Sequence, residues 1–167
     1  KTVLSKGHTL GTHTWSHPLN LRSQKIETSV GEIEKGFAAV SAAAGQPIAP
    51  FFRFPGLSHS AGMLQHLQGR GVATFTVDVV SNDSFISGVD QLTRETIAKV
   101  EGRKGGIILF HDIKAVTARA LPGILAELRS RGYRVVHMTA SKGFAPDQKL
   151  AADFGKQLAK SDAKSGG

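Results

Sequence analysis

The chain has 167 residues, of which 40% are hydrophobic and 20% are charged, a composition typical of a globular domain with a sizeable core. It has no cysteine, which excludes disulfide frameworks, thiolate metal sites and cysteine nucleophiles. The net charge of +8 favours acidic partners such as nucleic acid, anionic lipid or an anionic polymer. The basic residues are scattered, which argues against a nucleic-acid-binding protein, and no stretch reaches the apolar length of a membrane span.

Residues 1–7 are typical of the last turns of a helix that ends at Gly7, and no signal peptide is visible. We therefore expect a further segment to precede Lys1. A short strand is predicted over residues 8–13. It leads into His13-Thr14-Trp15-Ser16-His17-Pro18, where the spacing of four would place the imidazoles of His13 and His17 on one side of a helical turn. Two such imidazoles can share a metal ion, although a chain with seven histidines also produces this spacing by chance.

Periodic apolar residues then predict an alternation of helices and strands. Helices are predicted at 24–44, 61–70, 116–131 and 149–160, and a further one begins at Asp90 or Thr93 and ends at Val100. Strands are predicted at 50–54, 72–77, 107–110 and 133–136. Ser23 is expected to cap the first of these helices, Leu121, Leu125 and Leu128 are expected to face inward, and residues 78–84 are expected to form a loop. The polar residues 161–167 are expected to be disordered.

This order implies parallel strands joined by helical crossovers, either in a barrel or in an open α/β sheet. In both architectures, functional side chains gather at the carboxyl ends of the strands. The unusual polar residues of this chain lie there: Arg53, the loop from Asp78 to Asp83, and His111-Asp112. Their common placement is a stronger signal of a site than any one of them.

Each of these residues also has a structural interpretation. A histidine at a strand end, such as His111, can act as a general acid or can simply bond to the backbone. Asp83 could fix the tautomer of His111, or could cap a turn. Arg53 lies in an apolar run, where it needs a carboxylate partner unless its stem snorkels to the surface.

Four segments together resemble the polysaccharide deacetylase family, which is carbohydrate esterase family four or the NodB-homology domain. The segments are Gly7 to Pro18, Phe52 to Gly56, Asp78 to Asp83, and Ile108 to Asp112. Their order and spacing agree with the family over about residues 1–140. The first segment is highly specific and the last is moderately specific, whereas the two middle segments are weak alone.

The resemblance implies an α/β fold, a distorted (β/α) barrel that lacks its first strands, over residues 1–140, followed by a C-terminal extension over residues 141–167. It implies a metal-dependent hydrolase that removes acetyl groups from an N-acetylated glycan, either peptidoglycan or a chitin-like polysaccharide. The expected metal is divalent, Zn²⁺ first and Co²⁺ or a similar ion otherwise. A bacterial protein in the periplasm or secreted is expected from the family.

The resemblance also implies roles for eight residues. The implied metal ligands are His13 and His17. The implied catalytic residues are His111 as the acid, Asp83 as the carboxylate that tunes it, and Arg53, which orients the catalytic base. The implied substrate-binding residues are Pro55, Gly56, whose N–H would stabilise the oxyanion, and Leu109 in the acetyl-methyl pocket.

The chain departs from the family in three places. The Thr-Phe-Asp-Asp-Gly type motif, which carries the base and the third metal ligand, has no counterpart here. Ser84 follows Asp83 where the family usually has tryptophan, and Gly56 stands where many members have a bulkier residue. If the chain begins at Lys1, the alternative is a catalytically incomplete glycan-binding or scaffolding module. Asp78, Asp83 or Asp112 could substitute for the missing metal ligand, but the catalytic base would then remain unassigned.

Overall fold

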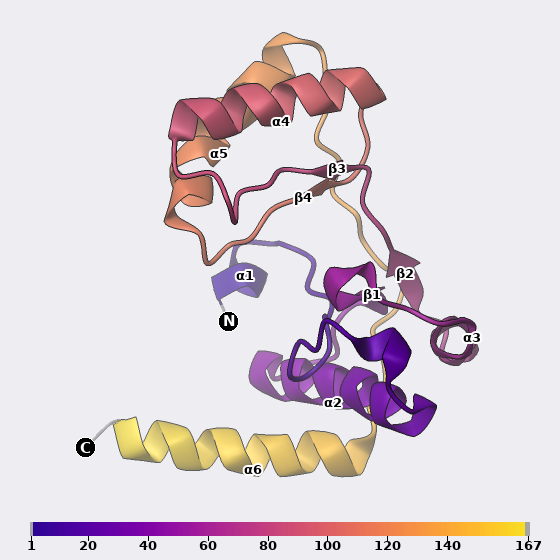
Figure 1. Cartoon of the computed structure of the whole chain (residues 1–167). Coiled ribbons are helices and arrows are strands. Elements are labelled where there is room, and N and C mark those ends of the chain that lie inside the picture. Colours follow the sequence, from indigo (N-terminus) through magenta and orange to yellow (C-terminus); the bar gives the residue numbers. More distant parts are fainter. Residues whose placement is uncertain (1, 166–167) are drawn as a thin grey trace. The chain divides into compact units, whose positions relative to one another are not determined.

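The computed structural model describes residues 2–165, with side chains described as far as Ser161. The chain divides into two compact units (Figure 1). Unit 1 is formed by residues 1–75 and 137–167, and unit 2 by residues 76–136. Residues that are distant in sequence therefore share unit 1. Within the described chain, no helix has the length and apolar character needed to cross a membrane.

Unit 1 places helices around short parallel strands. Its elements are α1 (Thr2–Ser5), a 3₁₀ turn η1 (Leu21–Ser23), α2 (Ile26–Ala44), β1 (Phe51–Arg53), a 3₁₀ turn η2 (Pro55–Leu57), α3 (Ala61–Gly69), β2 (Ala73–Phe75) and α6 (Gln148–Ser165). Strand β1 is central, because Phe52 pairs in parallel with Thr74 of β2 and with Thr12. The predicted parallel pairing with helical crossovers is confirmed here.

The core of unit 1 is built from aromatic and branched side chains of α2, β1 and α3. Phe37 and Phe52 are almost fully buried, and their ring centroids lie 6.2 Å apart. Phe144 stacks on Phe37 at 3.9 Å, and its N–H donates to the carbonyl of Ile48 at 2.7 Å. The segment that leads to α6 is thus part of this core, and α6 itself packs along α2 (Figure 1).

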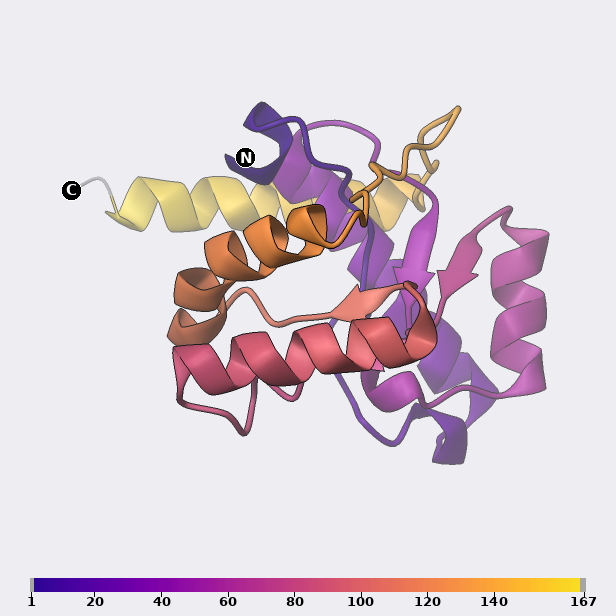
Figure 2. The ribbon, with the colours of Figure 1, turned by 90° about the horizontal axis from the view of Figure 1, so that it is seen from above.

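Unit 2 has a parallel pair of strands with two helices packed against it. Its elements are β3 (Val79–Val80), α4 (Val89–Arg103), β4 (Ile108–Leu109) and α5 (Ala115–Ser130). Val79 pairs with Ile108, and the crossover between the two strands is α4. Helices α4 and α5 lie side by side (Figure 2) and bury Leu92, Ile97, Ile124 and Leu128 between them and the strands.

Several boundaries differ from the sequence predictions. The predicted strand at 8–13 is reduced to the bridge at Thr12, and the predicted loop at 78–84 contains β3. Ser23 lies in η1, so its prediction as the cap of α2 is wrong, and Lys25 occupies the N-cap position. The predicted helix at 149–160 is confirmed, but it extends to Ser165, into the segment predicted to be disordered. Residues 166 and 167 lie outside the described residues.

Two predictions for unit 2 are wrong for tertiary reasons. Leu121 and Leu125 are 37% and 38% exposed, because α5 buries Ala120 and Ile124, which lie one position earlier, together with Leu128. The predicted strand at 133–136 does not form. In this unit the described strands β3 and β4 pair only with each other, so this segment has no ladder partner, and its valines are largely exposed.

Candidate active site

The two histidines of the sequence motif lie on a turn that is not helical. Thr14 and His17 have positive φ angles of 69° and 58°, which an α-helix cannot contain, so the predicted helical turn is wrong. The turn nevertheless brings the imidazoles together. The ring centroids of His13 and His17 are 4.8 Å apart, with the ring planes inclined at 72°.

Helix α2 holds this turn from one side. The N–H of Trp15 donates to the carbonyl of Glu32 at 3.0 Å, and the N–H of Ser16 donates to the Glu32 carboxylate at 2.8 Å. Gly36 permits this approach, because a Cβ at position 36 would lie only 2.7 Å from the carbonyl carbon of Thr14. A glycine inside a helix usually destabilises it, but here the missing side chain of Gly36 is what lets the histidine turn approach α2.

Strand β1 orients His13. The Nδ1–H of His13 donates a short hydrogen bond to the backbone carbonyl of Arg53. This tautomer carries its lone pair on Nε2, and a backbone acceptor on the other nitrogen is typical of metal-binding histidines. Two imidazoles at this separation fit two positions of a divalent metal site. Among the described residues, no group of three or more His, Cys, Asp or Glu side chains is gathered closely enough to hold an ion.

Arg53, Pro55 and Gly56 follow one another at the end of β1. Arg53 is half-buried, and burial lowers the pKa of its guanidinium. Pro55 is buried at the start of η2, and Gly56 is exposed with a φ of 55°, a conformation that favours glycine. The structure thus places Arg53 next to the His13–His17 turn of unit 1, through the contact between His13 and the Arg53 carbonyl, and Pro55 and Gly56 follow Arg53 in η2.

In unit 2, Asp83 and His111 form a hydrogen-bonded pair at the ends of β3 and β4. The Nδ1–H of His111 donates to Asp83 Oδ1 at 2.7 Å, and the backbone N–H of His111 donates to Oδ2 at 2.6 Å. Thr117 Oγ1 donates to the same Oδ2 at 2.7 Å. The carboxylate is 2% exposed, whereas the His111 side chain is 40% exposed. This arrangement fixes the imidazole and leaves it accessible.

The pKa of Asp83 reflects two opposing effects. Burial acts to raise it, but the hydrogen bonds from His111 and Thr117, together with the charge of His111, hold the pKa below its usual value. Asp83 therefore stays ionised and is available to stabilise a protonated His111. The carboxylate is acceptor to three donors, which does not suit the alternative role of a metal ligand.

The remaining acidic candidates have other places. Asp78 accepts a hydrogen bond from the N–H of Ile107 at 2.7 Å, which ties the start of β3 to β4. Asp112 is exposed in the turn after β4. Leu109 is the last residue of β4 and is partly buried, two positions before His111. Ser84, in the place of the family's tryptophan, puts its hydroxyl 3.3 Å from His111 Nδ1.

The structure therefore assembles the predicted residues as two groups, one in each unit. Unit 1 holds His13, His17 and the Arg53–Gly56 segment, and unit 2 holds Asp83, Leu109 and His111. Two supporting residues escaped the sequence analysis. Thr117 lies within α5 without a motif around it, and Glu32 looks like one of several charged residues on α2. Gly36 gave a usable signal, since a glycine in a helix interior often marks a close approach.

The polysaccharide deacetylase family model matches residues 1–75, the part that contains the His13–His17 turn and the segment after β1. The peptidoglycan-N-acetylglucosamine deacetylase of Listeria monocytogenes is 29% identical over 136 residues, which are 81% of this chain and 28% of that protein. The chain thus spans well under half the length of this relative.

Solved structures agree in fold. A peptidoglycan deacetylase from Bdellovibrio bacteriovorus matches with a TM-score of 0.76 and 31% identity, covering 84% of this chain and 39% of that one. A family-four pseudoenzyme from Bacillus anthracis matches with a TM-score of 0.73 at 22% identity, over 81% of this chain and 46% of its own, and this likeness concerns the fold alone. The predicted α/β fold of the deacetylase type is confirmed, and over residues 1–75 the chain is a member of the polysaccharide deacetylase family.

Proposed function

We propose that the protein is a metal-dependent deacetylase that removes acetyl groups from N-acetylglucosamine units of a glycan, with peptidoglycan as the first candidate. The observation that carries the proposal is the Asp83–His111 pair. A buried ionised carboxylate holds an accessible imidazole in one tautomer, which is the arrangement of a general acid–base group. The family match and the peptidoglycan deacetylase names of the relatives support the substrate class.

In the proposed reaction, water adds to the acetyl carbonyl and gives one proton to a carboxylate base of the kind that the family carries in its Asp-Asp motif. The C–N bond then breaks, and acetate and a free amine are released. His111 donates its Nε2 proton to the departing amine while its Nδ1–H stays bonded to Asp83. The N–H of Gly56 is the proposed donor to the oxyanion, and Leu109 is the proposed contact of the acetyl methyl group. A divalent ion held by His13 and His17, Zn²⁺ in the first place, would supply polarisation of the carbonyl and activation of the water.

Substrate charge and location follow from the same proposal. The net charge of +8 suits an anionic glycan polymer better than a neutral one. A cell-wall substrate places the protein in the periplasm or outside the cell. Arg53, desolvated at the end of β1, is the proposed partner of the catalytic base. Its guanidinium would orient the carboxylate of that base.

Acetate release from peptidoglycan and from acetylated chito-oligosaccharides tests the acid. His111→Ala should lower the rate by about 10²- to 10⁴-fold, the usual contribution of a general acid. His137→Ala is the matched control, because His137 bonds to Thr9 in unit 1 and has no proposed role. Undiminished release in His111→Ala would remove His111 from the mechanism. Faster release from chito-oligosaccharides than from peptidoglycan would transfer the proposal to a chitin-like substrate.

The second candidate is a glycan-binding module without catalysis. It is favoured by the fact that the described residues gather only two of the three ligands that a catalytic metal site needs. The two candidates differ in one measurement. An enzyme should bind about one divalent ion, lose it in His13→Ala or His17→Ala, and release acetate. A protein that binds glycan but releases no acetate with excess Zn²⁺ is the binding module.

A further inference from the structure

The chain's only tryptophan lies between the two histidines, and its ring contacts the C-terminal helix. Trp15 and Phe154 of α6 have ring centroids 4.6 Å apart, with planes inclined at 50°. Trp15 is 50% exposed, so its side chain has few neighbours, and Phe154 is one of them. The main chain at Trp15 and Ser16 is already bonded to Glu32 of α2. Through the Trp15 ring, α6 thus contacts the histidine turn.

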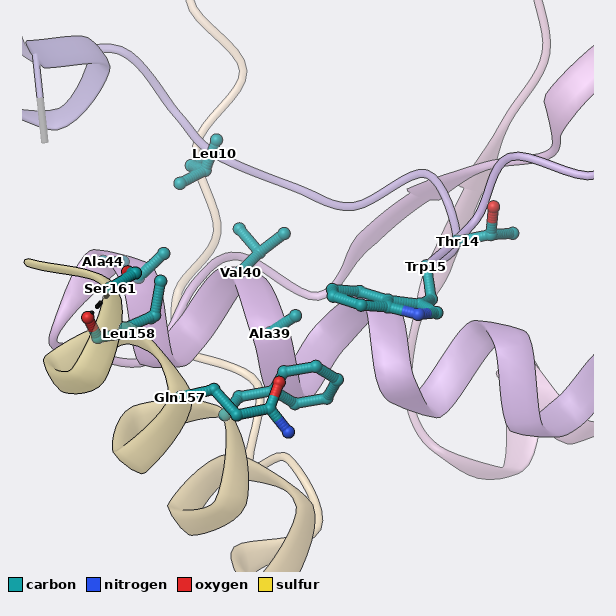
Figure 3. A pocket seen from close by; sticks show the side chains of 12 residues that line it. Leu10, Thr14, Trp15, Ala39, Val40, Ala44, Gln157, Leu158 and Ser161 are labelled. Carbon is teal, nitrogen blue, oxygen red and sulfur yellow. Dashed lines mark hydrogen bonds between the residues drawn. The ribbon is translucent and has the colours of Figure 1, made fainter. Parts of the chain in front are cut away.

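A cavity of about 550 Å³ lies between α6 and α2 beside this contact. The α2 side presents small residues, among them Ala39 and Ala44, which leave the space between the helices unfilled. Figure 3 shows Trp15 at one end of the cavity, and Leu158 with Ala44 at the other end. The Trp15–Phe154 pair and Leu158 therefore lie at opposite ends of the cavity, so that either side chain of α6 can be truncated without removing the other.

The turn has a reason to need such support. Thr14 is β-branched and has a φ of 69°, and His17 has a φ of 58°, so the backbone on both sides of Trp15 is in a conformation that is costly for these residues. A backbone of this kind persists only where its surroundings hold it. If the turn leaves the conformation that pairs the imidazoles, its apparent affinity for a metal falls by the fraction of time spent elsewhere.

We infer that α6 is a positioning element for the His13–His17 turn and that Phe154, through Trp15, sets the affinity of the turn for a divalent ion. The inference rests on the proposed function, because it takes the two histidines to be metal ligands. It assigns a role to residues beyond the four motif segments. In this role Phe154 acts through its contact with the tryptophan.

Zn²⁺ titration of the protein by calorimetry tests the inference, with Trp15 emission as an independent measure of the aromatic contact. Phe154→Ala should shift the emission to the red and raise the Kd for Zn²⁺ about 3- to 10-fold, the range that the loss of one aromatic pair can produce. Phe154→Tyr should restore both. Leu158→Ala is the matched control on the same helix and should leave the Kd within about twofold.

The outcomes of these titrations distinguish the role of Phe154 from the proposed metal site itself. If His13→Ala abolishes Zn²⁺ binding but Phe154→Ala, with its emission shifted, binds Zn²⁺ as tightly as the wild type, the inference is overturned and the proposed metal site stands. An equal loss of affinity in Leu158→Ala and Phe154→Ala also overturns it, because the effect is then one of general helix docking. If His13→Ala and His17→Ala both bind Zn²⁺ normally, the metal site itself is refuted.

Discussion

Substitution of Thr117 by valine removes one of the hydrogen-bond donors to the Asp83 carboxylate and changes the shape of the side chain little. The Thr117 side chain is buried, with 4% exposure of the residue, and Oγ1 donates to Asp83 Oδ2 at 2.7 Å. Valine has nearly the same shape and helix propensity, so packing in α5 is preserved. A hydrogen bond to a charged group contributes about 1.5–3 kcal/mol net. Thr117→Val should therefore lower the stability of unit 2 by about this amount at neutral pH.

The stability difference between the wild type and Thr117→Val should depend on pH. The pKa of Asp83 in the folded protein lies below its usual value of about 3.9, so the carboxylate's contribution to stability is fully present above that value. It is lost as the pH falls through the folded pKa, where Asp83 takes up a proton. The stability difference between wild type and Thr117→Val should hold steady from pH 7 to about pH 5 and narrow below about pH 3.9.

Urea unfolding followed by NMR signals of unit 2 amides, at pH 7, 5 and 3, measures this difference without averaging over both units. Thr96→Val is the control. Thr96 is fully buried in α4 of the same unit, and its Oγ1 meets no hydrogen-bond partner in the described part of the chain. It should be neutral or stabilising by up to about 1 kcal/mol, without pH dependence. Equal losses in the two variants would refute the role given to Thr117.

Two further pairs of variants test the seat of the histidine turn and the core of unit 2. Gly36→Ala should destabilise unit 1 by about 1–3 kcal/mol in urea titrations and weaken Zn²⁺ binding, because the new methyl group would meet Thr14. Gly31→Ala in the same helix is the control. Its methyl group would meet nothing within 4 Å, so the variant should stabilise unit 1 by about 0.5–1 kcal/mol. Ile124→Ala should lower the free energy of unfolding by about 2–4 kcal/mol in thermal unfolding, because Ile124 is fully buried. Leu121 is 37% exposed, so Leu121→Ala should lower it by less than about 1 kcal/mol. The reverse order would contradict the face of α5 that the structure shows as buried.

The architecture of the site is visible in the sequence to a considerable extent. Strands and helices alternate along the chain, and polar residues stand where the strands end, so the sequence predicts that Asp83 and His111 lie close together. The structure confirms that pair through a hydrogen bond of 2.7 Å. Their third partner was hidden, because Thr117 lies in the first turn of α5, and sequence spacing does not reveal which hydroxyl will face a carboxylate 34 positions away.

The sequence by itself determined the alternation of elements, the ends of most helices and the gathering of polar side chains at the strand ends, because these depend on local periodicity and on residue chemistry. Only the tertiary structure decided which face of α5 is buried, whether residues 133–136 find a strand partner, and how His13 and His17 meet. The histidine turn shows the reason. The turn contains two left-handed residues, and it is contacted by a carbonyl of β1, by Glu32 of α2 and by a phenylalanine 139 positions beyond Trp15. Such contacts depend on packing between distant segments, which the spacing of residues along the chain does not encode.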